Sequence, residues 1–153
     1  MKKIFCSIVI IGGLLLANSC SDNLEIKNDY DFTVTHLPVP KRLKTGETAE
    51  IRFELNRSGI YANAKYYVRY FQFDGEGTLT LDGQVLSPND SYELKTLGTT
   101  PKCKSETFRM YYTSQSEEQQ VIELTFYDTF RNQVVLTFSF AHQAVREENQ
   151  ENH

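Results

Sequence analysis

Several features that commonly reveal an activity are scarce or missing in this sequence. The 153-residue chain has no tryptophan, three histidines and three cysteines. It contains no G-x-S-x-G, P-loop or G-x-G-x-x-G motif, so the usual signatures of α/β-hydrolases and of nucleotide-binding domains are missing. Carboxylates are scattered singly or form short pairs such as Glu117-Glu118, a pattern typical of a solvated surface. We therefore expect a protein that is not an enzyme.

The histidines do not form a metal site in the sequence. His36, His142 and His153 are far apart, and none of the pairs has the spacing of metal ligands. No metal and no cofactor is therefore expected. The net charge of −4 also disfavours a nucleic-acid partner, because affinity for a phosphate backbone comes from lysine and arginine side chains.

No apolar run is long enough to cross a bilayer, which takes about 20 residues. The apolar run from Ile4 to Ala17 is shorter, follows a basic start and ends in small residues, as in a secretory signal peptide. The sequence that continues to Ser19-Cys20 resembles the bacterial lipoprotein box. This resemblance implies that residues 1–19 are removed and that Cys20 carries the lipid.

Two features of this segment depart from the usual lipoprotein box, since Ala17 stands where leucine is commonest and Asn18 is larger than usual. A transmembrane anchor and a secreted protein cut near Ser19 without lipid are the alternatives. Asp22 looks like the export tag of Gram-negative outer-membrane lipoproteins. We therefore expect a lipid-anchored protein of the cell envelope, on the outer membrane of a Gram-negative bacterium.

The cysteines exclude a disulfide within the mature domain. Cys6 lies in the signal peptide and Cys20 carries the lipid, so only Cys103 remains. Lys102 and Lys104 flank this thiol and can lower a thiol pKa, which makes a reactive cysteine one alternative. A thiol without a role is the other.

Residues 20–29 are predicted to be a membrane tether, residues 30–141 a β-sandwich, and residues 142–153 a disordered tail. The sandwich assignment rests on period-two alternation of apolar and polar side chains, which is typical of strands with one wet face. Residues 49–55 show it most clearly, with Ala49, Ile51, Phe53 and Leu55 on one side. The expected core residues are the following: Ile51, Phe53, Ile122, Leu124, Phe126, Leu136 and Phe138.

The number and spacing of these segments predict an all-β fold, an immunoglobulin-like β-sandwich of about seven strands. The Cys…Trp…Cys core of antibody domains is missing, so the fold is expected to be a relative of that class. The soluble domain is expected to be monomeric.

The segment from Tyr66 to Phe73 is aromatic on both sides, although a sandwich strand needs only one apolar face. Its outward side offers four candidate partner-binding residues: Tyr67, Arg69, Phe71 and Phe73. Exposed aromatic residues of this kind can bind a protein or a glycan. The alternative is a central strand whose outer face is covered by a loop.

The mature domain resembles the TraQ-type lipoproteins of conjugative transposons. The resemblance covers roughly Phe32 to Phe140 and is carried by several segments: residues 33–40, 46–52, 65–72, 77–79, 111–114 and 136–140. It implies an immunoglobulin-like fold and a place in a DNA-transfer apparatus, with other proteins of that apparatus as partners. It implies no reaction and no functional residues. Two functions remain open: a non-enzymatic accessory or scaffold component of this apparatus, and a surface lipoprotein that binds a glycan or protein unrelated to conjugation.

Overall fold

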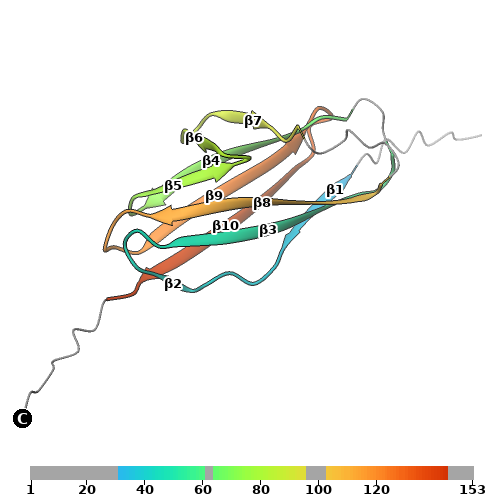
Figure 1. Ribbon diagram of the computed structural model, residues 1–153. Helices are drawn as coiled ribbons and strands as arrows, with labels where there is room; N and C mark the ends of the chain where they lie inside the picture. The colour runs from blue at the N-terminus through green and yellow to red at the C-terminus, as the bar shows by residue number, and fades with distance from the viewer. Residues whose placement is uncertain (1–30, 61–63, 96–102, 145–153) are drawn as a thin grey trace, which may run out of the picture.

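The structure, a computed structural model, describes residues 31–60, 64–95 and 103–144 as two packed β-sheets. These residues form ten strands and no helix. Figure 1 shows the two sheets lying face to face, with the long strands of each running roughly along the same axis. Since no helix occurs in the described residues, none of them can form a membrane-spanning helix.

The first sheet has the strand order β1-β3-β8-β5-β6. Its strands are β1 (Phe32–His36), β3 (Thr48–Arg57), β8 (Ser105–Ser114), β5 (Gly77–Leu81) and β6 (Gln84–Leu86). The second sheet has the order β2-β10-β9-β4-β7. Its strands are β2 (Arg42–Leu43), β10 (Gln133–His142), β9 (Gln120–Asp128), β4 (Tyr66–Asp74) and β7 (Ser91–Glu93).

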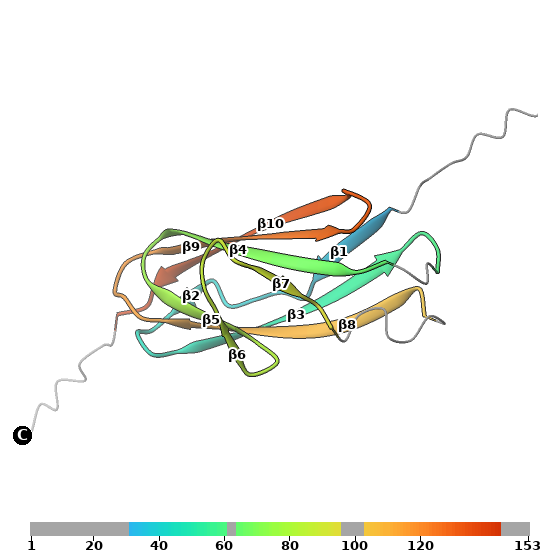
Figure 2. The same cartoon turned by 90° about the horizontal axis from the view of Figure 1, so that it is seen from above.

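The chain crosses repeatedly between the two sheets. It passes from β4 to the β5–β6 hairpin of the first sheet and then returns to the second sheet as β7, beside β4. Figure 2 shows β5, β6 and β7 grouped at one side of the sandwich. The orders β1-β3-β8-β5 and β10-β9-β4 are those in which strands A-B-E-D and G-F-C lie in immunoglobulin domains.

The core consists of the inward-facing residues of both sheets, as the alternation predicts. Of the seven expected core residues, six are buried: Ile51, Phe53, Ile122, Leu124, Phe126 and Phe138. The seventh, Leu136, is only partly buried and packs against the core from β10. On the side away from β9, its strand has no neighbour in the sheet at that point among the described residues, which leaves one side of Leu136 open to solvent.

The expected count of about seven strands is too low. Two of the additional strands, β2 and β6, have two and three residues. Strands this short cannot display an alternating pattern in the sequence. They form because a neighbouring strand is available to pair with them. At the C-terminal end, β10 includes His142, and the Gln143 amide donates a hydrogen bond to the Leu43 carbonyl at 2.9 Å.

Candidate functional site

The outward side of β4 carries the four residues that the sequence analysis proposed for partner binding. Tyr67 and Phe71 are half-buried, whereas Arg69 and Phe73 are exposed, and Phe73 is 58% accessible. The intervening Tyr66, Val68 and Tyr70 are buried in the core. The predicted register of this strand is therefore confirmed.

Aromatic rings stack in two pairs on this surface. The Tyr67 ring stacks on Tyr127 of β9 with centroids 5.3 Å apart and an interplanar angle of 17°. The Phe71 ring stacks on Phe73, with a centroid distance of 6.0 Å. We call the surface formed by these four rings the aromatic face. Tyr127 could not be predicted from the sequence, because its place beside Tyr67 follows from the pairing of two strands about 60 residues apart in sequence.

Polar groups flank the aromatic face. Glu93 on β7 lies opposite Tyr67 and forms a salt bridge with Lys65, with 3.4 Å between the charged atoms. Glu123 on β9 lies opposite Phe71. Arg69 stands between Tyr67 and Phe71 on the same side of β4 and lies opposite Thr125. An arginine among aromatic rings, with acidic groups at the rim, is the composition of many protein-binding surfaces.

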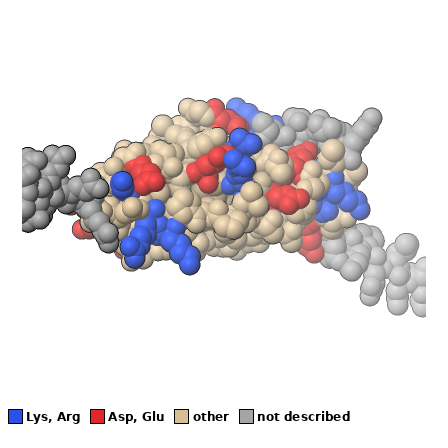
Figure 3. Space-filling model, turned by 60° about the horizontal axis from the view of Figure 1, so that its bottom comes forward, with Lys and Arg blue, Asp and Glu red and all other residues tan. Residues whose placement is uncertain are grey.

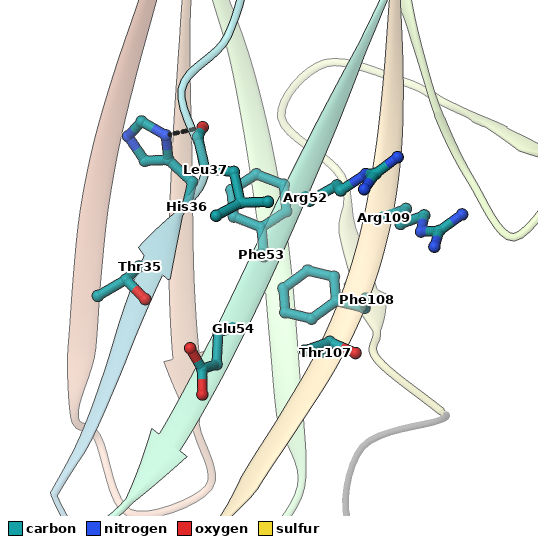
Figure 4. A pocket seen from close by; sticks show the side chains of 9 residues that line it. All are labelled: Thr35, His36, Leu37, Arg52, Phe53, Glu54, Thr107, Phe108 and Arg109. Atoms are coloured by element: carbon teal, nitrogen blue, oxygen red, sulfur yellow. Dashed lines mark hydrogen bonds between the residues drawn. The ribbon is translucent and has the colours of Figure 1, made fainter.

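The outer side of the first sheet presents a different surface, a shallow groove across β1, β3 and β8. Figure 4 shows Arg52 and Arg109 projecting from one end of this groove and Glu54 lying toward the other. The cavity volume is about 330 Å³, and the buried rings of Phe53 and Phe108 lie beneath it.

A single carboxylate binds both arginines of this groove. Arg52 and Arg109 lie directly opposite each other on β3 and β8. Arg52 binds Glu50 through two contacts of 3.0 and 3.2 Å, and Arg109 Nε lies 3.2 Å from the same carboxylate. The hydrogen bond from Arg52 is the main cause that lowers the pKa of the Glu50 carboxyl. Because Glu50 already binds both cations, the groove offers an added anion only a weakly positive site.

Charges on the surface do not form a broad basic region on the face that Figure 3 presents. Acidic and basic side chains both occur there, in small separate groups, and much of that face carries neither. This distribution gives no extended track for a phosphate backbone on that face.

The other candidate residues stay apart in the described part of the chain. Cys103 is exposed. His36 packs edge-to-face on Phe138 at 4.8 Å, and its Nδ1 lies 2.8 Å from the Leu37 carbonyl oxygen. In residues 31–60, 64–95 and 103–144, no three histidine, cysteine or acidic side chains converge as metal ligands would. Residues 1–19, Cys20 and the proposed tether lie outside the described residues.

Two polar clusters that the sequence did not reveal stabilise the domain. Arg57 is 8% exposed and binds Glu106 at 2.7 Å and the Cys103 carbonyl oxygen at 2.8 Å. Its guanidinium also lies 5.0 Å from the centre of the Tyr66 ring. This cluster attaches the segment that leads into β8 to the end of β3, which explains why a buried arginine occurs here.

The second cluster joins two buried tyrosines through Gln72. The Tyr70 hydroxyl donates to Gln72 Oε1 at 3.0 Å, and Gln72 Nε2 donates to the Tyr112 hydroxyl oxygen at 3.0 Å. Burial raises the pKa of Tyr70 to about 12 and also raises that of Tyr112. Both hydroxyls therefore stay protonated at neutral pH, and neither is a candidate base.

Comparison with known proteins identifies the family. The family described as TraQ conjugal transfer protein matches residues 3–143, most of the chain. The chain belongs to this family. The resemblance inferred from the sequence is thereby confirmed. No curated protein matches the chain.

Solved structures of three proteins from Bacteroides are similar to this chain. A lipoprotein from Bacteroides thetaiotaomicron, solved by NMR, is 47% identical, with a TM-score of 0.64; the alignment covers 86% of this chain and 95% of that one. A conjugative transposon lipoprotein from Bacteroides eggerthii, solved by crystallography, is 39% identical, with a TM-score of 0.62 and coverage of 72% and 97%.

A conjugate transposon protein from Bacteroides vulgatus is also similar, at 39% identity and a TM-score of 0.60. Here the alignment covers 86% of this chain and 99% of the relative. All three alignments cover at least 72% of this chain and at least 95% of the relative, so the similarity extends well beyond an isolated motif.

Proposed function

We propose that this TraQ-family protein is a non-enzymatic accessory or scaffold component of the DNA-transfer apparatus of a conjugative transposon. It is attached to the cell envelope by lipid at Cys20. Two observations support the lipid anchor: the sequence resembles a lipoprotein box, and relatives 47% and 39% identical are described as lipoproteins. The description of two relatives as conjugative transposon proteins supports the place in DNA transfer.

The aromatic face is the proposed docking surface for another protein of the apparatus. Its stacked rings remain partly accessible on the outer side of the second sheet, and this observation carries the proposal. Aromatic and arginine side chains are the residues from which protein interfaces draw much of their binding energy. The rings are already held against one another, so binding costs little side-chain ordering.

The proposed lipid holds the β-sandwich at the membrane. A diacyl, N-acylated cysteine supplies more than one chain, which is what stable membrane attachment requires. The proposed tether of residues 20–29 is short, so the sandwich is held near the bilayer. We propose that this sandwich is immunoglobulin-like, on the basis of its strand order. The proposed location is the outer membrane of a Gram-negative bacterium.

The test is a comparison of surface variants in cells that carry the full transposon. Tyr67→Ala combined with Arg69→Ala should fold normally, because both side chains lie outside the core. The double variant should lower conjugation frequency and lose a transfer protein that co-purifies with the wild type. Val85→Ala is the matched control, since Val85 is 60% exposed on the other sheet.

Normal transfer and normal partner recovery by the double variant, at unchanged protein levels, would contradict the docking surface. Normal transfer together with loss of binding to a cell-surface glycan would favour the glycan-binding alternative. Unfolding of the double variant would instead indicate that these side chains support the sheet, and Phe73→Ala then provides a second test at the most exposed ring of the aromatic face.

A further inference from the structure

Strand β10 forms a long open edge of the second sheet. It pairs with β9 along one side from Gln133 to Phe140, whereas on its other side β2 pairs only with Ala141 and His142. Within the part of the chain that the structure describes, no strand pairs with this second side between Gln133 and Phe140. Figure 1 shows β10 at the border of the second sheet, with β2 beside only the C-terminal end of β10.

The direction of the backbone groups on β10 follows from the bonds at its end. The Ala141 amide donates to Lys41 O and the Gln143 amide donates to Leu43 O, both at 2.9 Å and both away from β9. Alternate residues of a strand point their backbone groups to the same side. The amides and carbonyls of four more odd-numbered residues therefore face the open edge: Gln133, Val135, Thr137 and Ser139.

The strands at the other sheet edges are shorter than β10. Proteins usually shield edges with short strands, prolines or charged side chains. Strands β6 and β7 have three residues each, and Pro38 follows β1 closely. Strand β10 has ten residues, QVVLTFSFAH, without lysine, arginine, acidic residue or proline. Such an edge readily accepts another strand.

We propose that the occupant of this edge is a second copy of the chain, whose β10 pairs antiparallel with the first about a two-fold axis at Leu136. This register places Val135 opposite Thr137 of the second copy and Gln133 opposite Ser139. Each of these residues presents its backbone groups to the edge, so about eight hydrogen bonds form between the strands. Ala141, already bound to β2, is left outside the new ladder.

Two properties of β10 favour a second copy over an unrelated segment. Residues 133–140 of this strand carry no acidic or basic side chain, so self-pairing brings no like charges together. Val134 and Leu136 are apolar and only partly buried at this edge. The two-fold register sets Leu136 against Leu136 of the second copy. This contact would bury the part of the Leu136 side chain that is exposed in a single domain.

A strand-edge contact is small compared with the roughly 1,200–2,000 Å² of a stable interface. We therefore expect the dilute soluble domain to stay monomeric, which is also the prediction from the sequence. Attachment of both copies to one membrane raises their effective concentration, which allows a weak contact to form. The pairing would also join two aromatic faces in one continuous sheet, although it does not depend on what the aromatic face binds.

The experiment uses the full chain in membranes of cells that express it, with Cys103→Ser to remove the exposed thiol. Residues facing each other in a non-hydrogen-bonded pair have Cα atoms about 4.5 Å apart, within the range that a disulfide spans. Leu136→Cys should therefore give a covalent dimer on mild oxidation, seen by non-reducing electrophoresis. Cys103→Ser alone and Val85→Cys, on the edge strand β6, are the controls and should give none.

A second pair of cysteines avoids the partly buried Leu136. Val135→Cys with Thr137→Cys changes two exposed residues and should form the same dimer. Adding Thr137→Pro to Leu136→Cys should abolish the dimer without unfolding, because the Thr137 amide makes no bond to β9. Failure of both cysteine designs to crosslink at normal protein levels would overturn the proposal. So would equal crosslinking by Val85→Cys, or a crosslink from β10 to a different protein only.

Discussion

Gly77 on β5 makes room for the ring of Tyr112 on β8. A methyl group at position 77 would lie 2.6 Å from Cε2 of Tyr112 and closer still to Cζ and the hydroxyl oxygen. The ring cannot retreat, because Phe140 stacks on it at 5.3 Å with an interplanar angle of 9°. The Tyr112 ring therefore lies against the backbone of the neighbouring strand β5, within the same sheet, at a distance that only glycine permits.

Gly77→Ala should destabilise the domain for this steric reason. Forcing extra atoms into a well-packed core costs about 1–3 kcal/mol, which urea denaturation followed by circular dichroism would measure as a lower midpoint. The control is the same change in a Tyr112→Ala background, where the obstructing ring is gone and the added cost should be small. An equal cost in both backgrounds would contradict the steric explanation.

The buried pair of Arg57 and Glu106 should be sensitive to the loss of one partner. Glu106→Ala leaves the Arg57 guanidinium, whose side chain is 4% exposed, without its carboxylate. Breaking such a pair typically costs about 3–5 kcal/mol in the free energy of unfolding, again measurable by denaturation. Arg57→Met combined with Glu106→Leu should be more stable than Glu106→Ala, because no buried charge remains. This interpretation would be contradicted if the double variant were less stable than both the wild type and Glu106→Ala.

Stability should fall at alkaline pH because of Tyr70. Burial raises its pKa to about 12 in the folded protein, whereas the ordinary tyrosine value is 10.0. Between these values the unfolded state loses its proton first, so the folded state is favoured below pH 10 and loses this advantage as pH rises toward 12. The contribution is at most about 3 kcal/mol. Thermal unfolding from pH 9 to 12 should show the decline, and Tyr70→Phe should reduce its slope; an unchanged slope would be inconsistent with this assignment.

Cys20 should be the first residue of the mature, lipidated chain. Mass spectrometry of the membrane fraction should find a triacylated Cys20 at the N-terminus, and Cys20→Ala should leave the precursor uncut. Ser21→Ala is a neighbouring change that should leave processing intact. Recovery of an unlipidated soluble protein that begins elsewhere would contradict the lipid anchor.

The parts of the fold that could be predicted from the sequence are those where one strand face is buried along its length. In β3, Ala49 to Leu55 alternate clearly, and the structure buries the apolar side of that strand. The double-sided aromatic character of residues 66–73 likewise indicated a strand with rings left over outside the core. These are local patterns, and period-two alternation records them directly.

Features that depend on distant partners were not predictable. Arg57 falls in a segment that reads as the start of a loop, and its burial depends on Glu106, 49 residues further along. The convergence of Arg52, Arg109 and Glu50 requires the register between β3 and β8. The half-exposure of Leu136 follows from the position of β10 at a sheet edge, which strand order decides and alternation does not record.

The pairing of β3 with β8 also affects when the domain can fold. Thr48 pairs with Thr113 and Asn56 with Ser105, so β3 has no partner on that side until β8 has emerged. Strand β4 depends in the same way on β9. A chain that emerges from its N-terminus can therefore form pairs such as β1 with β3 early, but it cannot complete either sheet before β8 and β9 have emerged. The high contact order of this arrangement predicts slow folding, in the range of milliseconds to seconds.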